Sequence, residues 1–153
     1  MAVVTMVITA MVICAAACQR PRMATARFIH LPSSGWIATV PLTFEPVYND
    51  STAPCDLYLA LRHDNRYRYR NITLVVDVLG DNAALRRSTL DIPLADEYGN
   101  WSSGGFGPLY QVSVPIARHA APVTARRVVV WQTMAPGDTL TGIVDVGIIT
   151  RPE

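Results

Sequence analysis

Residues 56–79 read DLYLALRHDNRYRYRNITLVVDVL, and they carry the clearest structural signal in the chain. In the first part of this stretch, Leu57, Leu59 and Leu61 occupy every second position. Apolar side chains fall at every second position of 71–79 as well. Successive side chains of a strand point to opposite faces of the sheet. The alternation therefore predicts two strands, each with one face on a core and the other toward water.

The same period of two continues on both sides of this stretch, and no helical period interrupts it. It predicts further strands at 26–31, 39–44, 88–94, 110–116, 126–134 and 140–149. The last two ranges are apolar on both faces for part of their length, as is typical of central strands. A Pro-Gly-Asp turn between them predicts a C-terminal hairpin. We therefore expect an all-β fold, an antiparallel β-sandwich of the jelly-roll type with about eight strands.

The N-terminus has the features of an export signal. From Ala2 to Ala17 the chain is uncharged and mostly apolar, which is short for a membrane span but suits a signal peptide. Three alanines lead into Cys18. This small-residue pattern resembles the sites where bacterial lipoprotein signal peptidase cleaves, just before a cysteine that carries diacylglycerol. A plain secretory signal, cleaved after Ala17, is the alternative.

The expected domain organisation follows from that cleavage. It comprises a lipoprotein signal peptide at 1–17, the lipidated cysteine and a tether at 18–26, and the β-sandwich domain at 27–153. After lipidation Cys55 stands alone among the cysteines of the mature chain. A disulfide framework is thereby excluded, and a small buried hydrophobe is the expected role of Cys55.

Composition limits the possible function further. Half of the 153 residues are hydrophobic and 16% are charged, so the chain can fill a core and is not a disordered tail. The net charge is +1. A net charge this close to zero provides no excess of basic residues for binding nucleic acid, and we expect no nucleic-acid partner.

No motif for catalysis or metal binding is present. His30, His63 and His119 lie far apart, and none has a second metal ligand two or four positions away. We expect all three histidines at the surface. We also expect no catalytic residue, no metal site and no cofactor, so the sequence does not predict an enzyme.

Two loops combine aromatic and polar residues. The Arg- and Tyr-rich segment 62–71 suits either an anionic ligand or a long hairpin connection whose rings cover the edge of the core, and we favour the structural interpretation. The segment 96–107 contains Tyr98, Trp101 and Phe106. These three residues form a possible binding loop, which is either a recognition loop or a packed Ω-loop. The sequence leaves both interpretations open.

The order of motifs along the chain resembles a known family, the gliding-motility lipoprotein GldH of Bacteroidetes. Besides the lipobox cysteine and Trp36, the matching residues are Leu61-Arg62-His63, Tyr69, Asn71, Leu94-Ala95-Asp96-Glu97, Gly99, Trp101, Gly104-Gly105-Phe106-Gly107, Leu109-Tyr110, Trp131-Gln132-Thr133-Met134, Asp138, Leu140 and Gly142-Ile143-Val144-Asp145-Val146-Gly147. They span most of the mature chain.

This resemblance implies a non-catalytic lipoprotein of the cell envelope, accessory to gliding motility or to an associated secretion machine. It implies an outer-membrane anchor through lipid such as palmitate on Cys18, protein partners in that apparatus and no catalytic residues. The alternative is a lipid-anchored, surface carbohydrate-binding sandwich that uses Tyr98, Trp101 and Phe106. A flat row of exposed rings favours glycan binding, whereas buried rings favour a protein scaffold.

The charge of the tether indicates which side of the outer membrane the domain faces. Surface-exposed lipoproteins of Bacteroidetes resemble one another in carrying acidic residues just after the lipidated cysteine. Here residues 19–27 contain three arginines, and no acidic residue occurs before Glu45. A basic tether is attracted to anionic head groups. We therefore expect the domain to face the periplasm.

Overall fold

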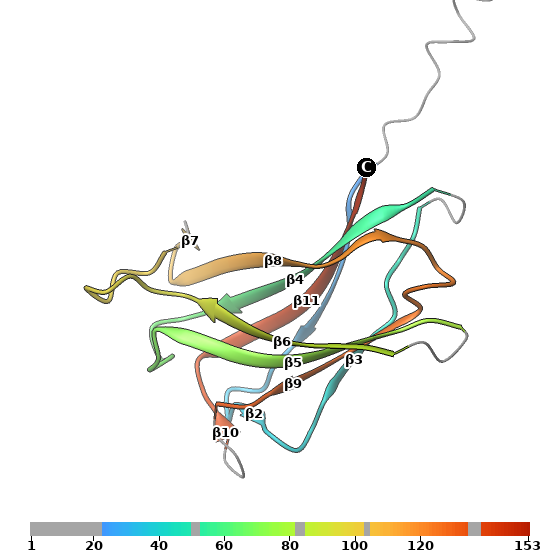
Figure 1. Cartoon of the computed structure of the whole chain (residues 1–153). Coiled ribbons are helices and arrows are strands. Elements are labelled where there is room, and N and C mark those ends of the chain that lie inside the picture. The colour runs from blue at the N-terminus through green and yellow to red at the C-terminus, as the bar shows by residue number, and fades with distance from the viewer. Residues whose placement is uncertain (1–22, 50–52, 82–84, 103–104, 135–138) are drawn as a thin grey trace, which may run out of the picture.

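The computed structural model describes residues 23–49, 53–81, 85–102, 105–134 and 139–153. These residues form an all-β domain (Figure 1), as the alternating sequence pattern predicts. The described residues contain no helix that is long and apolar enough to cross a membrane.

Eleven strands occur in the described part of the chain, and three of them are only two residues long. The remaining eight confirm the expected number. In chain order the strands are β1 (Thr25–His30), β2 (Trp36–Ile37), β3 (Leu42–Phe44), β4 (Cys55–His63), β5 (Asn71–Leu79), β6 (Leu85–Pro93), β7 (Gly105–Phe106), β8 (Leu109–Ala120), β9 (Arg127–Gln132), β10 (Thr139–Leu140) and β11 (Ile143–Pro152).

The longer strands form two antiparallel sheets that pack face to face, visible as two layers in Figure 1. The first sheet has the order β1-β11-β4-β8-β7, and the second has the order β3-β9-β5-β6. The short β7 forms a hairpin with β8. Among the eight longer strands described, β5 and β6 form a hairpin within one sheet, and every other connection crosses to the opposite sheet. This is the jelly-roll arrangement, so the predicted fold class is confirmed.

The core lies between the two sheets. Six side chains that the alternation directs inward have no exposed surface: Leu57, Leu59, Leu61, Ile72, Leu74 and Val76. Full burial of one such side chain contributes about 1.5–3 kcal/mol to the free energy of unfolding. The predicted register of β4 and β5 is therefore confirmed.

The expected C-terminal hairpin is wrong. β9 lies in the second sheet between β3 and β5, whereas β11 lies in the first sheet between β1 and β4. The short β10 pairs with β2. Both long strands are central, as their apolar faces predict, but a turn signal fixes only where the chain reverses. Which sheet the next strand joins depends on contacts far away in the sequence.

The two ends of the sandwich differ in what they carry. At one end, here called the base, Thr25 at the start of β1 pairs with Thr150 near the end of β11 (Figure 1). At the other end, here called the far end, His63 closes β4 opposite Tyr110 of β8. β4 runs from base to far end with nine residues, which corresponds to about 30 Å. The chain therefore enters the domain at the base.

Candidate functional site

Segments 62–71 and 96–107, which the sequence marks as unusual, contribute to two loops that lie side by side at the far end. These loops are residues 64–70, which join β4 to β5, and residues 94–101, which follow β6. The Trp101 indole Nε1 donates a hydrogen bond of 2.9 Å to Asn65 Oδ1. The backbone N–H groups of Leu94 and Ala95 donate to the carbonyl of Arg70 at 2.7 and 2.9 Å. We call these two loops together the far-end platform.

The first of these loops corrects the sequence interpretation in one respect. Segment 62–71 was expected to be a hairpin connection, but β4 and β5 belong to different sheets, so the loop crosses the end of the sandwich. Of its two tyrosine rings, Tyr67 covers the core edge as expected and Tyr69 does not. Tyr67 is buried and donates from its hydroxyl to the Asn71 carbonyl at 2.8 Å, while Tyr69 is 44% exposed.

A cluster of aromatic rings packs between the platform loops and the first sheet. The imidazole of His63 lies 4.5 Å from the Trp101 ring, 5.4 Å from the Tyr110 ring and 5.9 Å from the Tyr67 ring, measured between centroids. Tyr67 and Trp101 come from the two platform loops, whereas His63 and Tyr110 come from neighbouring strands. The cluster therefore joins both loops to the first sheet.

His63 has no exposed surface, which contradicts the expectation that all three histidines are at the surface. Only His30 and His119 are exposed. Neither ring nitrogen of His63 has a hydrogen-bond partner among the described residues. Burial lowers the pKa of the His63 imidazole, and nearby Asp64 partly opposes this effect. The signal was present in the sequence, because position 63 continues the inward phase of Leu57, Leu59 and Leu61.

The possible binding-loop residues occupy different environments. Trp101 is half-buried against the ring cluster, whereas Tyr98 is 83% exposed. Phe106 belongs to β7, whose backbone pairs with Leu109, and its side chain is outside the described set. Trp101 and Tyr98 thus do not present one continuous aromatic surface.

Asp96 holds the second loop in shape. Its carboxylate accepts hydrogen bonds from the backbone N–H groups of Tyr98 and Asn100, at 2.9 and 2.8 Å, and from the Asn100 side-chain amide at 2.9 Å. The Asn100 amide is the main reason why the pKa of Asp96 lies below its ordinary value. Because the Asp96 carboxylate makes these three hydrogen bonds within the loop, Asp96 has a structural role there.

The outward side of the platform carries Tyr and Arg side chains. Tyr69, Tyr98, Arg68 and Arg70 are all exposed. Arg66 forms an ion pair of 2.7 Å with Asp64, whereas Arg68 and Arg70 have no acidic partner among the described residues. Tyr and Arg are enriched among the residues that dominate binding energy in protein interfaces.

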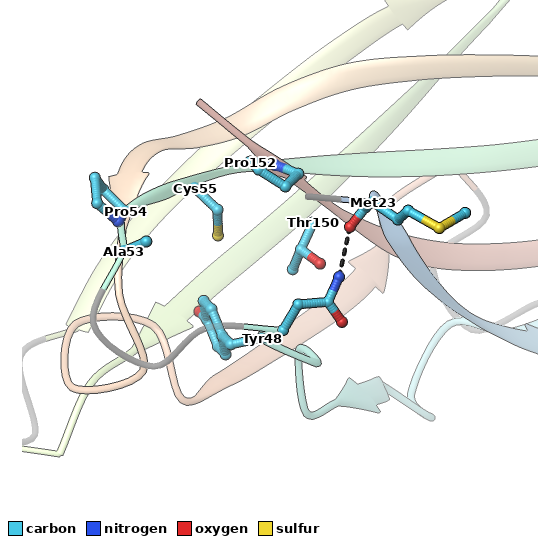
Figure 2. A pocket seen from close by; sticks show the side chains of 8 residues that line it. Met23, Tyr48, Ala53, Pro54, Cys55, Thr150 and Pro152 are labelled. Atoms are coloured by element: carbon cyan, nitrogen blue, oxygen red, sulfur yellow. Dashed lines mark hydrogen bonds between the residues drawn. The ribbon is translucent and has the colours of Figure 1, made fainter. Parts of the chain in front are cut away.

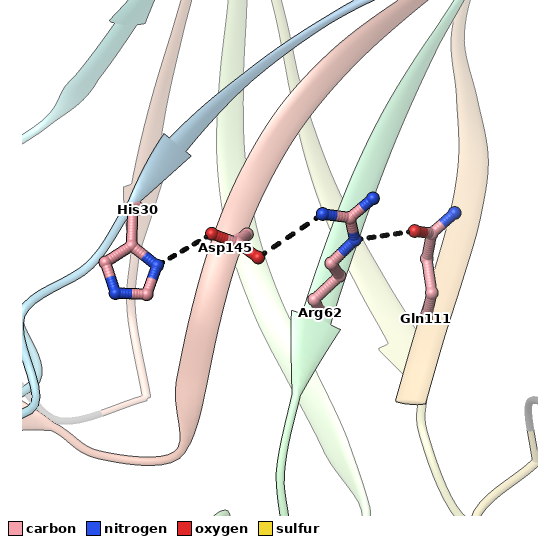
Figure 3. A network of polar contacts seen from close by, with 4 residues as sticks. All are labelled: His30, Arg62, Gln111 and Asp145. Atoms are coloured by element: carbon pink, nitrogen blue, oxygen red, sulfur yellow. Dashed lines mark hydrogen bonds and ion pairs between the residues drawn. The ribbon is translucent and has the colours of Figure 1, made fainter. Parts of the chain in front are cut away.

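A row of polar side chains crosses the outer face of the first sheet (Figure 3). His30 Nδ1 lies 2.9 Å from Asp145 Oδ1. Arg62 contacts Asp145 Oδ2 at 3.5 Å and donates to Gln111 Oε1 at 2.8 Å. A His–Asp pair also occurs in catalytic triads, but there the second ring nitrogen faces a nucleophile. That nitrogen of His30 has no partner among the described residues. The contacts of the row join side chains of the four strands β1, β11, β4 and β8.

A small cavity at the base is lined by Met23, Tyr48, Cys55, Thr150 and Pro152, among others (Figure 2). Its volume of about 30 Å³ is far below the roughly 300–1,000 Å³ of sites for small-molecule ligands. Cys55 is buried as expected, and burial is the main cause that raises the pKa of its thiol. It therefore packs as a small hydrophobe at neutral pH.

No group of three metal-ligating side chains occurs within the described ranges. Cys18, the predicted lipidation site, lies outside those ranges, five positions before Met23. Met23 itself is exposed at the base.

The comparisons with known proteins agree with the motifs found in the sequence. The family model of the GldH lipoproteins matches residues 24–149. A gliding motility lipoprotein GldH homolog of Christiangramia forsetii is 31% identical over 72 residues, which cover 47% of this chain and 44% of that relative. The match thus spans less than half of the relative's length. No solved structure matches the chain. Since the family model covers nearly all of the β-sandwich, the chain belongs to the GldH lipoprotein family.

Proposed function

We propose that this protein is a non-catalytic lipoprotein of the cell envelope, held in the outer membrane by lipid on Cys18. Its far-end platform binds a protein of the gliding apparatus or of an associated secretion machine. The domain itself contributes a rigid scaffold that keeps this surface away from the membrane.

The observation that carries this proposal is the position of the platform relative to the start of the domain. The chain enters at Thr25 in the base, whereas the platform loops follow His63 at the other end of β4. Cys18 lies five positions before Met23, and a chain of that length reaches at most about 18 Å. The base would therefore stay close to the bilayer, with the platform roughly 30 Å farther out.

The arrangement of the rings supports a protein partner rather than a glycan. A sugar-binding surface needs exposed ring faces, but Trp101 uses its ring against His63 and its indole N–H on Asn65. The exposed residues of the platform are the Tyr and Arg types that protein interfaces favour. The family membership is consistent with a non-catalytic role.

The direction in which the domain faces is part of the proposal. The basic tether favours the inner leaflet of the outer membrane, with the domain in the periplasm. Proteinase added to intact cells should then leave the protein whole and degrade it only after the outer membrane is permeabilised. Digestion on intact cells would instead place the domain at the cell surface.

A complementation experiment tests the function. In a strain of the source organism that lacks this gene, the wild-type protein should restore surface movement or secretion. A double variant, Tyr69→Ala with Tyr98→Ala, should restore it poorly although the protein accumulates normally. Val123→Ala, which changes an exposed apolar residue at the base, serves as the matched control and should behave as wild type. Full activity of the double variant would contradict a role for the platform.

A further inference from the structure

His63 is the buried ionisable group for which the scaffold function gives no reason. It has no exposed surface, and both of its ring nitrogens lack a partner among the described residues. A buried polar atom without a hydrogen bond costs free energy, and a buried charge without a partner costs much more. A phenylalanine or leucine would fill this space without that cost. The ring is thus tolerated only in its neutral form.

Among the described residues around His63, the backbone and the carboxylate of Asp64 favour its charged form, and burial outweighs both. From the platform loops His63 faces the rings of Tyr67 and Trp101, and from β8 it faces the ring of Tyr110. On β11 its neighbour in the ladder is Ile143.

The nearest carboxylate is that of Asp64, the next residue in the chain. It is held by Arg66 through contacts of 2.7 and 2.9 Å and therefore already has a cationic partner. The other charged residues of the platform loops, including Arg68, Arg70, Asp96 and Glu97, are exposed to solvent.

The two sides that enclose the ring differ in strength. His63 and Tyr110 belong to β4 and β8, which are joined by a long antiparallel ladder. The loop side has no such ladder and is held chiefly by the Trp101–Asn65 bond, the two bonds to the Arg70 carbonyl and the bond from the Asp64 N–H to the Gly142 carbonyl. When the protonated ring has to be solvated by water, the loops therefore move and the two strands stay in place.

We propose that protonation of His63 opens the far-end platform, so that its two loops are ordered at neutral pH and released in mildly acidic surroundings. A proton from water adds to a ring nitrogen, and the loops separate so that water solvates the imidazolium. The release of the bound partner at low pH is the part of this inference that rests on the proposed function.

The pH range follows from the direction of the shift. Burial lowers the pKa of His63, so the open state, with a pKa near the ordinary value of about 6.5, binds more protons than the closed state. The closed platform therefore has its full stability above about pH 6.5 and loses stability as the pH falls below that value. If the His63 ring stays neutral in the closed state, the equilibrium constant for opening the platform increases by at most about thirtyfold between neutral pH and pH 5.

Hydrogen–deuterium exchange of the full lipoprotein in detergent tests this inference. The exchange rates are first corrected for the pH dependence of intrinsic exchange. The opening equilibrium constants of amides in 64–70 and 94–101 should then be at least about fivefold larger at pH 5 than at pH 7.5. Segment 120–126 at the base should not change. The His63→Phe variant should lose the response, whereas His30→Gln should keep it. Loops that do not respond in the wild type, or that respond equally in His63→Phe, would overturn the inference.

A measurement on the wild type covers the case in which His63→Phe does not fold. In a histidine-labelled sample, the His63 ring should remain neutral below the ordinary histidine pKa of about 6.5. Its protonation should coincide with loss of the Trp101 indole N–H signal. A His63 ring that titrates at the ordinary histidine pKa of about 6.5, or an indole signal that is unaffected, would overturn the inference. Loops that open while partner crosslinking persists at pH 5 would instead contradict the proposed function of the platform.

Discussion

Trp101 and Asn65 stand 36 positions apart in the sequence, yet the indole Nε1 donates a 2.9 Å hydrogen bond to the Asn65 side-chain oxygen. Each residue belongs to a different platform loop. The bond therefore connects the two segments that the sequence presents as separate features. It also turns the Trp101 ring toward His63, where the ring supports the loops instead of facing solvent.

The contribution of this bond can be measured with a substitution that keeps a ring. Trp101→Phe removes the donor and should lower the free energy of unfolding by about 0.5–1.5 kcal/mol, with some further loss from the smaller ring. Urea denaturation measures this change. Trp131→Phe, on the outer face of the second sheet, is the control, and we expect Trp101→Phe to increase protease cleavage in 64–70 where Trp131→Phe does not. Equal cleavage of the two variants would show that the bond does not hold the loops.

The core register predicts the effect of truncating two leucines. Leu59 and Leu74 have no exposed surface, so Leu59→Ala and Leu74→Ala should each cost about 2–5 kcal/mol in unfolding experiments. Val40→Ala changes a half-exposed residue and should remain within about 0.5 kcal/mol of the wild type. A loss below about 0.5 kcal/mol at either leucine would contradict the assigned register.

Alanine substitutions at two glycines distinguish the cost of backbone strain from the cost of a steric clash. Gly142 and Gly99 both have positive φ, +88° and +85°, so an alanine at either position costs about 1–2 kcal/mol in conformational energy. A Cβ at Gly142 would lie only 2.2 Å from the Tyr67 backbone nitrogen, whereas a Cβ at Gly99 meets nothing within 4 Å. Gly142→Ala should therefore destabilise the domain clearly more than Gly99→Ala. Similar unfolding free energies for the two variants would contradict the close approach of Gly142 to the platform.

The lipid anchor is tested by changing the cysteines of the N-terminus. Cys18→Ser should abolish palmitate incorporation and release the protein from the membrane fraction, because the several acyl chains on a lipoprotein cysteine provide the firm attachment. Cys14→Ser alters a cysteine four positions earlier and should leave the label in place. Unchanged labelling of Cys18→Ser would exclude this residue as the anchor.

The sequence predicts much of the sandwich because single strands are encoded locally. Alternation in 71–79 places β5 at the observed bounds, and it places Leu57, Leu59 and Leu61 on the core. The same alternation directs position 63 inward, but the usual preference of histidine for the surface concealed this.

Relations between distant segments were not predictable in the same way. The sequence marks 62–71 and 96–107 as unusual loops but contains no local signal that Asn65 meets Trp101. It likewise does not show that β9 and β11 join different sheets. Both facts depend on which strands pair across long separations, and in a jelly roll the chain usually changes sheets between consecutive strands.

Site-specific photo-crosslinking in living cells tests the central claim, that the far end of a lipid-anchored domain binds the partner, most directly. A photoreactive amino acid is placed either at Tyr98, which is 83% exposed on the platform, or at Val123, which is 62% exposed at the base. We expect a discrete protein adduct from position 98, identified by mass spectrometry as a component of the gliding or secretion apparatus, and its loss when Trp101→Ala disrupts the platform. An adduct with such a component from position 123 and none from position 98 would contradict the account.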